Sequence, residues 1–459
     1  MPNFDNISNL FPQLKGAYIV GGAVRDVLLG QSPPDYDIAA KNPYQLAKTL
    51  SQKINASLVR LGKGQDSIFR IVSDKYSFDI TYLNDNCIQT DLMKRDFSVN
   101  ALAYEVSSRE IIDVAGGIHD LKAKKLRIVS SDVFQKDPIR LIRAFRISSM
   151  LNFTIHPHTL STIALHATLI RNAAKERIHA ELLKFFQTSG SYTYLEKMEA
   201  TKLIFNIFPE LLSLKKCEQN QHHQYDVLQH TLKAYYHLEQ ILNTRFSEQL
   251  PQPGQNINKN RQSLLKCAIL LHDIGKPLVK TFDKAVHFYD HESKGADMAV
   301  QICKRLKFSN NQNDFIHAII RNHLRPMNLF LSSPNGNFTQ KNLIRFFLKC
   351  KNLTPYLVLH SVADSMAKRS DNKNNSEFID FAKRVLKIFY NDFVPTQTKP
   401  AFITGKDLIR EFKLTPSPLF KTILDDLQQA TLCKVIKTRQ QALQRVQFFL
   451  EKHPENFKD

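Results

Sequence analysis

The sequence contains no apolar run long enough to cross a membrane. Hydrophobic residues make up 43% of its 459 residues, but charged side chains interrupt every apolar stretch. None approaches the roughly 20 residues that a transmembrane helix needs. The stretch MPNFDNISNL also lacks the basic segment followed by an apolar one that is typical of a signal peptide. We therefore expect neither membrane insertion nor secretion.

Cysteine is scarce, and its distribution excludes one kind of small domain and disfavours another. The six cysteines are Cys87, Cys217, Cys267, Cys303, Cys350 and Cys433. No two of them form a CxxC pair, which excludes a zinc ribbon, and their wide spacing disfavours a disulfide framework. The sequence therefore predicts a protein of the reducing cytoplasm.

Acidic residues are few relative to basic ones. The chain has 63 Lys and Arg residues against 43 Asp and Glu residues, which gives a net charge of +20. This balance favours a polyanionic partner such as nucleic acid, because each phosphate that a cation neutralises releases counterions. The alternative is a lysine-rich surface that serves only solubility. The length favours two to four domains.

The pattern of apolar residues changes near residue 135. Before it, the candidate strands AYIVGG, SIFRIV, SFDITYL and EIIDVA alternate with helical patterns. From about Asp137, apolar residues recur every three or four residues, as in DPIRLIRAFRISSML, which indicates helices. Polar breaks at 249–262, 332–337 and 394–400 predict loops. The sequence thus predicts an α+β fold, with a mixed α/β head followed by a long all-helical body.

The first candidate site lies in YIVGGAVRDVLLGQSPPDYDIAA, residues 18–40. We expect a strand, a turn at Gly21 and Gly22, and a helix that ends at Gly30. Glycines let backbone amides approach a ligand closely, and a helix N-terminus attracts anions. Arg25 in the first turn of this helix can add a charge-assisted contact to phosphate.

Two carboxylates follow this turn. Asp35 and Asp37 are two residues apart, so on a strand both side chains point to one face. Together with the glycine turn they predict a divalent-metal site for phosphoryl or nucleotidyl transfer. Taken alone, either feature is more often an ordinary turn or a solvated pair of acidic residues.

Four motifs in this order resemble the bacterial tRNA nucleotidyltransferase (CCA-adding enzyme) and poly(A) polymerase family. They are GGAVRD followed by DxD, DLMKRDFSVNALAYE at 91–105, DPIRLIRAFR at 137–146 and KERIHAELLKFF at 175–186. The resemblance covers about residues 15–190 closely, and the ordered set of motifs is highly specific.

The resemblance implies a role for each matching residue. Asp35 and Asp37 would hold two magnesium ions, one at the RNA 3′-hydroxyl and one at the triphosphate. The nucleotide-binding set would be Gly21, Gly22, Arg25, Arg95, Asp96, Asp137, Arg140, Arg143 and Arg146. Asp137 and Arg140 would read the incoming base, since a carboxylate accepts from the exocyclic amine of C or A and a guanidinium donates to ring acceptors.

Three further residues complete this expectation. Glu176 and Arg177 would orient the arginines of 137–146, and Asp79 in SFDITYL is the most plausible third carboxylate. The alternative for 137–146 is an Asp–Arg salt bridge on a basic helix.

Departures from the family pattern bear on which nucleotide is added. Lys136 stands where most members have Glu, and only NDNCIQT separates the strand ending near Leu83 from Asp91. Because a short segment there resembles members that add only two cytidines, we hypothesise a CC-adding activity. The alternative is a poly(A) polymerase that adds AMP to RNA 3′ ends. The stretch LVRLGKGQDSIFR disfavours it, because it lacks the adjacent basic residues usual in those enzymes.

A second candidate site lies in the helical body. LLHDIGK places His272 and Asp273 after an apolar helix, where two polar groups are costly unless hydrogen bonds or a metal hold them. The order H…HD…H…H…D resembles the HD-domain metal phosphohydrolases. It implies a centre for a divalent transition metal or magnesium made by His230, His272, Asp273 and Asp364. His291 and His323 would complete a second centre or position phosphate.

The prediction divides the chain into four parts. These are a nucleotidyltransferase head at 1–135, a nucleotide-selecting neck at 136–210, an HD domain at 215–395 and a tRNA-binding tail at 400–459. The basic stretch KVIKTRQQALQR in the tail suits contact with an RNA backbone. The expected partners are tRNA, CTP and ATP. The alternative from another class is a metal phosphohydrolase with a vestigial nucleotide-binding head.

Overall fold

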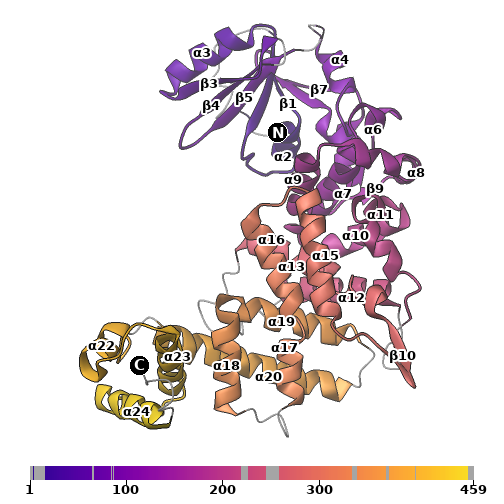
Figure 1. Ribbon diagram of the computed structural model, residues 1–459. Coiled ribbons are helices and arrows are strands. Elements are labelled where there is room, and N and C mark those ends of the chain that lie inside the picture. Colours follow the sequence, from indigo (N-terminus) through magenta and orange to yellow (C-terminus); the bar gives the residue numbers. More distant parts are fainter. Residues whose placement is uncertain are drawn as a thin grey trace. The chain divides into compact units, whose positions relative to one another are not determined.

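The structure is a computed structural model that describes residue 4 and residues 16–64, 67–83, 85, 87–218, 226–243, 258–332, 339–368, 372–397 and 400–452. The chain forms two compact units, residues 1–209 and 210–459, whose elements are labelled in Figure 1. All six cysteines fall within the described ranges and are free thiols there. Every helix in these ranges is too short or too polar to span a bilayer.

The first unit is built on one mixed seven-stranded sheet with the order β3-β4-β5-β2-β1-β6-β7. Strand β2 runs parallel to β5, and the other neighbouring strands are antiparallel. The strands are β1 (Ala17–Val20), β2 (Tyr36–Ala40), β3 (Ser57–Leu61), β4 (Ile68–Val72), β5 (Ser77–Tyr82), β6 (Leu102–Glu105) and β7 (Glu110–Asp113). The mixed α/β head that the sequence predicts is confirmed.

Alternation of side chains along the central strands separates a core face from the face that carries the acidic pair. Ile19, Ile38 and Ile80 are directly opposite one another on β1, β2 and β5, and all three are fully buried. The next residue in each strand points to the opposite face of the sheet. The register then places Asp37 between Val20 and Asp79 on the other face.

Helices cover the sheet and continue beyond it within the first unit. They are α2 (Gly22–Leu28), α3 (Pro43–Lys53), α4 (Ile88–Met93), α5 (Gly117–Lys122), α6 (Val133–Lys136), α7 (Arg140–Leu151), α8 (Pro157–His166), α9 (Lys175–Phe186), α10 (Ser191–Ala200) and α11 (Leu203–Ile207). Helices α7 and α9 pack on each other. A short parallel pair, β8 (Lys125–Leu126) with β9 (Thr154–Ile155), joins the segments before and after α7.

The second unit is helical, as predicted. Its helices are α12 (Val227–Asn243), α13 (Lys259–Leu271), α14 (Lys276–Val279), α15 (His291–Arg305), α16 (Asn310–Asn322), α17 (Arg325–Leu331), α18 (Gln340–Cys350), α19 (Thr354–Met366), α20 (Asn372–Ile388), α21 (Val394–Gln397), α22 (Gly405–Phe412), α23 (Pro418–Leu432) and α24 (Arg439–Lys452). Helix α12 packs on α13 and α19, and α16 packs on α13 and α15. The last three helices enclose an apolar cluster of their own.

Several local expectations are wrong. The body is not entirely helical, because it contains β9 and the hairpin of β10 (Thr281–Asp283) and β11 (Ala285–His287). Helix α13 begins inside the loop predicted at 249–262, where the side chain of Asn258 caps it by accepting from the amide of Asn260. Helix α21 occupies the start of the break predicted at 394–400. Residues 249–257, 333–337 and 398–399 of the predicted breaks lie outside the described residues.

Candidate active site and candidate metal centre

The glycine turn lies where β1 ends and α2 begins. Gly21 has φ of +74°, a conformation that disfavours any side chain. A Cβ at Gly21 would lie 2.8 Å from Arg95 Nη1 and 3.9 Å from Asp37 Oδ2. The turn is therefore closely flanked by a guanidinium on one side and a carboxylate on the other.

Arg25 is only 7% exposed and is held by protein groups. Its Nη1 donates to Asn100 Oδ1 at 2.7 Å, and its Nε donates to Asp26 Oδ1 at 2.7 Å. The prediction that Arg25 contacts phosphate stays a prediction, and these two bonds set the orientation from which it would do so.

Asp35 and Asp37 form an acidic pair at the start of β2. Asp35, in the bend before this strand, and Asp37 are both exposed. Even so, crowding by protein raises the pKa of Asp37, and Arg95 only partly offsets this while Asp35 and Asp79 add repulsion. Ionised carboxylates that lie close together repel one another, and a divalent cation bound between them removes this repulsion. The donor set therefore fits magnesium.

Asp79, the expected third carboxylate, lies beside Asp37 in the register but is engaged elsewhere. It accepts two hydrogen bonds from Arg70, at 2.7 Å and 2.6 Å, from the neighbouring strand β4. A metal-binding role for Asp79 requires this ion pair to open.

The motif at 91–105 supplies the buried floor of the site. Arg95 Nε and Nη2 donate to Asp91 at 3.1 Å and 3.0 Å, which holds its guanidinium beside Gly21. Asp96 is buried and accepts from Phe97 N at 2.8 Å and from Asn100 Nδ2 at 3.1 Å. Burial alone would raise the pKa of Asp96, but the guanidinium of Arg143 and these hydrogen bonds lower it below its ordinary value.

Two arginines of α7 join this floor to α9. Arg143 Nε donates to Asp96 Oδ2 at 2.9 Å, and Arg146 Nε donates to Glu181 Oε2 at 2.6 Å. Glu181 also lies 3.9 Å from Arg143 Nη1. The prediction that Glu176 orients these arginines finds no support, because Glu176 is exposed and the buried Glu181, one turn and a half further along α9, holds that position.

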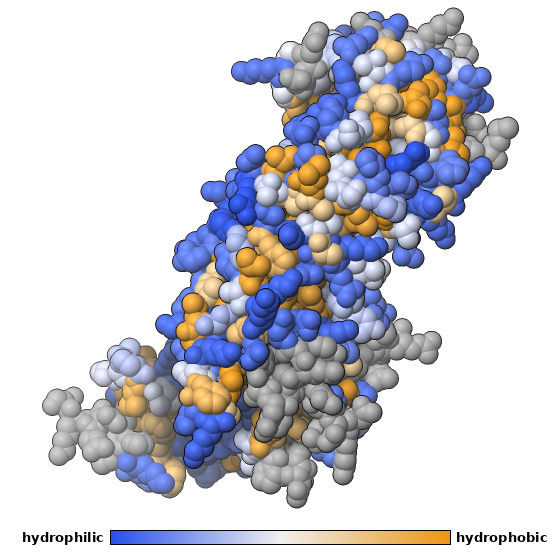
Figure 2. Space-filling view, turned by 90° about the vertical axis from the view of Figure 1, so that its right-hand side faces the viewer, coloured by the Kyte–Doolittle hydropathy of each residue, from blue (hydrophilic) through white to orange (hydrophobic). Residues whose placement is uncertain are grey.

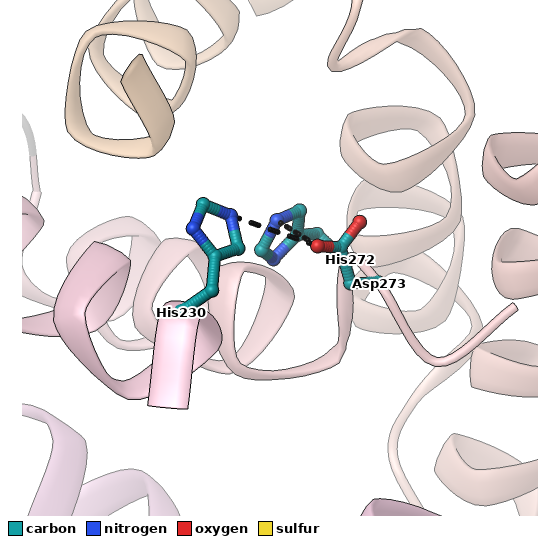
Figure 3. Close-up of side chains that lie close together, drawn as sticks. All are labelled: His230, His272 and Asp273. Atoms are coloured by element: carbon teal, nitrogen blue, oxygen red, sulfur yellow. Dashed lines mark ion pairs between the residues drawn. The ribbon is translucent and has the colours of Figure 1, made fainter. Parts of the chain in front are cut away.

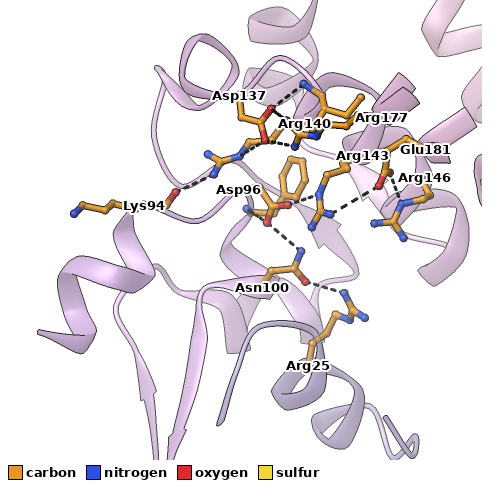
Figure 4. A network of polar contacts seen from close by, with 12 residues as sticks. Arg25, Lys94, Asp96, Asn100, Asp137, Arg140, Arg143, Arg146, Arg177 and Glu181 are labelled. Atoms are coloured by element: carbon orange, nitrogen blue, oxygen red, sulfur yellow. Dashed lines mark hydrogen bonds and ion pairs between the residues drawn. The ribbon is translucent and has the colours of Figure 1, made fainter. Parts of the chain in front are cut away.

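The expected base-reading pair is positioned by Arg177 and by the backbone. Arg177 donates to both oxygens of Asp137, at 3.0 Å and 2.8 Å. Arg140 Nη2 donates to the carbonyl of Lys94 at 3.2 Å, and its Nε lies 3.9 Å from Asp137. Arg140 Nη1 is buried and has no hydrogen-bond partner among the described residues. Figure 4 shows these contacts, together with those that join Arg25 through Asn100 and Asp96 to Arg143.

In the second unit, five helices that pack together each bring at least one ligand-type side chain to one point. Two groups have all their ligand atoms within 4.8 Å of one another: His230, His272 and Asp273, and Asp273 with His291 and His323. Figure 3 shows the first group, whose ring nitrogens point at the carboxylate of Asp273. His230 Nε2 also lies 2.8 Å from Asp364 Oδ1. All six predicted residues are buried and converge.

Three of these histidines are oriented in the same way. The Nδ1 atoms of His272, His291 and His323 lie 2.7 Å, 2.8 Å and 2.7 Å from the carbonyl oxygens three residues earlier in each case. A donated Nδ1–H leaves the lone pair of Nε2 free to face the centre, which is how metal-binding histidines are usually fixed. The donor set of imidazoles and carboxylates fits a divalent metal.

Lysines lie against both carboxylates of the centre. Lys276 Nζ is 2.7 Å from Asp273 Oδ2, and Lys368 Nζ is 2.9 Å from Asp364 Oδ2. Burial would raise the pKa of Asp273, but His272 and Lys276 hold it well below the ordinary value. Burial also opposes ionisation of Asp364, but Lys368 and His230 hold its pKa well below the ordinary value, so the ionised form that binds a metal is favoured in both carboxylates.

The sequence interpretation missed His360, one helical turn before Asp364 on α19. It is fully buried, and its ring centroid lies 5.2 Å from that of His272 and 5.5 Å from that of His323. Neither of its ring nitrogens has a hydrogen-bond partner among the described residues. Such a group is costly unless something satisfies it, so His360 also fits a metal or metal-bound water. The spacing of four residues before Asp364 is the signal that could have identified it.

Three known families match successive parts of the chain. Residues 17–127 match the "Poly A polymerase head domain" family, and residues 227–369 match the "HD domain" family. Between them, residues 152–214 match the family described as "Probable RNA and SrmB- binding site of polymerase A".

Two of three curated relatives match over more than nine-tenths of the chain. The A-adding tRNA nucleotidyltransferase of Deinococcus radiodurans is 30% identical over 96% of this chain and 96% of its own length. The CC-adding tRNA nucleotidyltransferase of Thermus thermophilus is 27% identical over 93% of this chain and 92% of its own length. That of Geobacter sulfurreducens is 35% identical over 42% of this chain and 45% of its own.

Solved structures share the fold. The Thermotoga maritima CCA-adding enzyme complexed with tRNA has a TM-score of 0.67, with 19% identity, over 98% of this chain and 97% of that one. A CCA-adding enzyme in complex with CTP has a TM-score of 0.67, also with 19% identity, over 97% of this chain and 95% of that one.

Proposed function

We propose that this chain, which belongs to the tRNA nucleotidyltransferase family, adds CMP from CTP to the 3′ end of tRNA and releases pyrophosphate. The observation that carries the proposal is the approach of Arg95 and Asp37 to the Gly21 turn, where a Cβ would lie 2.8 Å from Arg95 Nη1 and 3.9 Å from Asp37 Oδ2. A carboxylate, a guanidinium and open backbone together suit a metal-bound triphosphate.

Asp35 and Asp37 would bind magnesium, the ion expected for nucleotidyl transfer. Magnesium bound there would favour ionisation of the RNA 3′-hydroxyl and neutralise the charge of the triphosphate. The protein residues then do the positioning. The Gly21–Gly22 turn leaves room for phosphate oxygens, and Arg95, fixed by Asp91, donates to them. No covalent intermediate with the protein is needed.

Base selection is proposed for the pair Asp137 and Arg140. A carboxylate has about four lone-pair positions, so Asp137 can accept from the base while Arg177 donates to both its oxygens. The unpartnered Nη1 of Arg140 would donate to an acceptor on the edge of the same base. Both C and A offer such an edge, so this pair alone does not select one of them.

The choice of CMP rests on a different feature. Strand β5 ends at Tyr82 and α4 begins at Ile88, so five residues join them. A short segment at this place resembles the family members that add only two cytidines, as inferred from the sequence. A second candidate, addition of the terminal A, is favoured by the 30% identity with the A-adding relative of Deinococcus radiodurans over nearly the whole chain.

We also propose that the HD centre binds one or two divalent ions and hydrolyses phosphoesters. The convergence of His230, His272, Asp273 and Asp364 supports this, as do the common orientation of the histidines and the unsatisfied ring of His360.

The test offers labelled CTP and ATP, first separately and then together, to tRNAs ending at the discriminator base, at C and at CC. A CC-adding enzyme transfers CMP to the first two and nothing to the third. Transfer of AMP to the third alone favours the A-adding candidate, and assembly of a complete CCA rules out both partial activities. Extension of unrelated RNA with A alone indicates a poly(A) polymerase.

A further inference from the structure

A long stretch of the second unit contains no acidic residue. Between Asp314 and Asp364 the sequence has no Asp or Glu, although Arg and Lys occur six times. The six are Arg321, Arg325, Lys341, Arg345, Lys349 and Lys351. In a chain with 43 acidic residues, a run of this length with one sign of charge marks a surface suited to an anion.

The fold gathers three of these cations at one cleft. Helices α17 and α18 border a cavity of about 420 Å³ that Arg325, Arg345 and Lys349 line. Asn328 and Asn342 add amide donors. Ser332 adds a hydroxyl, Leu329 and Phe346 give an apolar floor, and no carboxylate is among the lining residues.

The cations of this cleft lack acidic partners, unlike others in the same unit. Arg305 pairs with Glu210 at 2.9 Å, and Arg445 pairs with Asp426 at 2.6 Å. Among the described residues, Arg325, Arg345 and Lys349 form no ion pair, and Arg325 donates only to the amide oxygen of Asn322.

The arrangement also carries a repulsion. Arg345 and Lys349 are one helical turn apart on α18, where two like charges destabilise a helix. An anion bound between the helices would offset this repulsion. It would accept hydrogen bonds from the guanidinium groups of Arg325 and Arg345. Phosphate matches that geometry, because its oxygens accept the paired donors of arginine.

We propose that this cleft, defined by Arg325, Arg345 and Lys349, binds the phosphodiester backbone of the tRNA substrate. The inference rests on the proposed function, which supplies the tRNA. It adds a contact in the HD-containing unit, outside the nucleotide site, that contributes affinity and salt dependence without reading sequence. Figure 2 shows one face of the molecule, on which hydrophilic and hydrophobic side chains are interspersed.

The experiment compares two full-length double variants with the wild type. Arg345→Gln with Lys349→Gln removes two charges from the cleft. Lys341→Gln with Lys351→Gln removes two exposed charges from the same stretch outside it and is the matched control. The dissociation constant of tRNA is measured at several KCl concentrations, together with kcat for CMP transfer, KM for a cyclic phosphodiester at the HD centre, and thermal unfolding.

The cleft variant should weaken tRNA binding several-fold at about 0.1 M KCl. It should also reduce the slope of log Kd against log [KCl] by about 0.7–0.9 for each phosphate that the cleft no longer neutralises. The control should change neither, and kcat should stay at the wild-type value in both.

Equal weakening of tRNA binding in the two variants would overturn the inference, because it would show a diffuse effect of net charge. So would a change confined to the KM of the phosphodiester, which would assign the cleft to the HD substrate. Failure of the proposed function looks different: the wild type would then bind tRNA without transferring any nucleotide.

Discussion

The first prediction concerns Asp96, the buried carboxylate at the centre of the polar network in the first unit. It accepts from Arg143 Nε at 2.9 Å, from Phe97 N at 2.8 Å and from Asn100 Nδ2 at 3.1 Å. All three neighbours are donors. In the Asp96→Asn variant, whichever way the amide is turned, its NH₂ group faces one of them.

The expected loss of stability follows from these contacts. Removing one partner of a buried ion pair typically costs about 3–5 kcal/mol. Glu181 lies 3.9 Å from Arg143 and compensates part of the uncovered charge, so the lower end applies. A loss of about 3 kcal/mol lowers the melting temperature of a unit of this size by about 6–12 °C.

Differential scanning calorimetry of the full chain measures this shift, with Asp132→Asn as control. Asp132 is an acid of the same unit, half exposed and paired only with Lys136 and Ser130, and its variant should melt close to the wild type. If Asp96→Asn melts within about 2 °C of the wild type, the buried ion pair does not stabilise the unit as argued.

The effect of pH has a definite sign. The pKa of Asp96 is lowered in the folded state, so its contribution is complete above the ordinary carboxyl pKa of about 3.9. It is lost as the pH falls through the lower, folded-state pKa. The difference in melting temperature between the wild type and Asp96→Asn should therefore be full at pH 7 and shrink below about pH 4.

The remaining predictions concern both sites. Gly21→Ala places a Cβ 2.8 Å from Arg95 Nη1 at a positive φ, so KM for CTP should rise about tenfold or more, and an unchanged KM in steady-state assays would contradict the proposed phosphate site. The variant His272→Ala with Asp273→Ala should lose bound metal in elemental analysis and all metal-dependent 2′,3′-cyclic phosphodiesterase activity, while CMP transfer continues. His360→Gln should weaken metal binding by about 10–100-fold in competition with a chelator, and wild-type affinity would show that His360 only fills the core.

The sequence allowed the division into a mixed head and a helical body to be predicted, since periods of two and of 3.6 residues are local features. The acidic pair was predicted only in part: Asp37 lies on β2 as expected, but Asp35 lies in the bend before it, where the alternation of a strand does not fix the direction of the side chain. Strand β6 was missed because it lies inside the motif at 91–105. That segment was interpreted as a nucleotide-binding motif, and its residues were not examined for the pattern of a strand.

Contacts between helices far apart in sequence were harder to predict. Glu176 and Glu181 both lie on α9, and only the packing of α9 on α7 decides that Glu181 meets Arg146. His360 was missed for a similar reason, since its role depends on where α19 lies beside the helices that carry His272 and His323. The spacing of His360 four residues before Asp364 indicates a shared face of α19, but only the packing of α19 decides what that face contacts.

The most direct test of the central claim is the position of the metal beside a bound nucleotide. Crystals grown with CTP and Mn²⁺ in place of Mg²⁺ give anomalous peaks at each ion. The account predicts peaks at the carboxylates of Asp35 and Asp37, with the triphosphate against the Gly21–Gly22 turn and near Arg95. Triphosphate bound elsewhere, with no manganese at these two carboxylates, would contradict it.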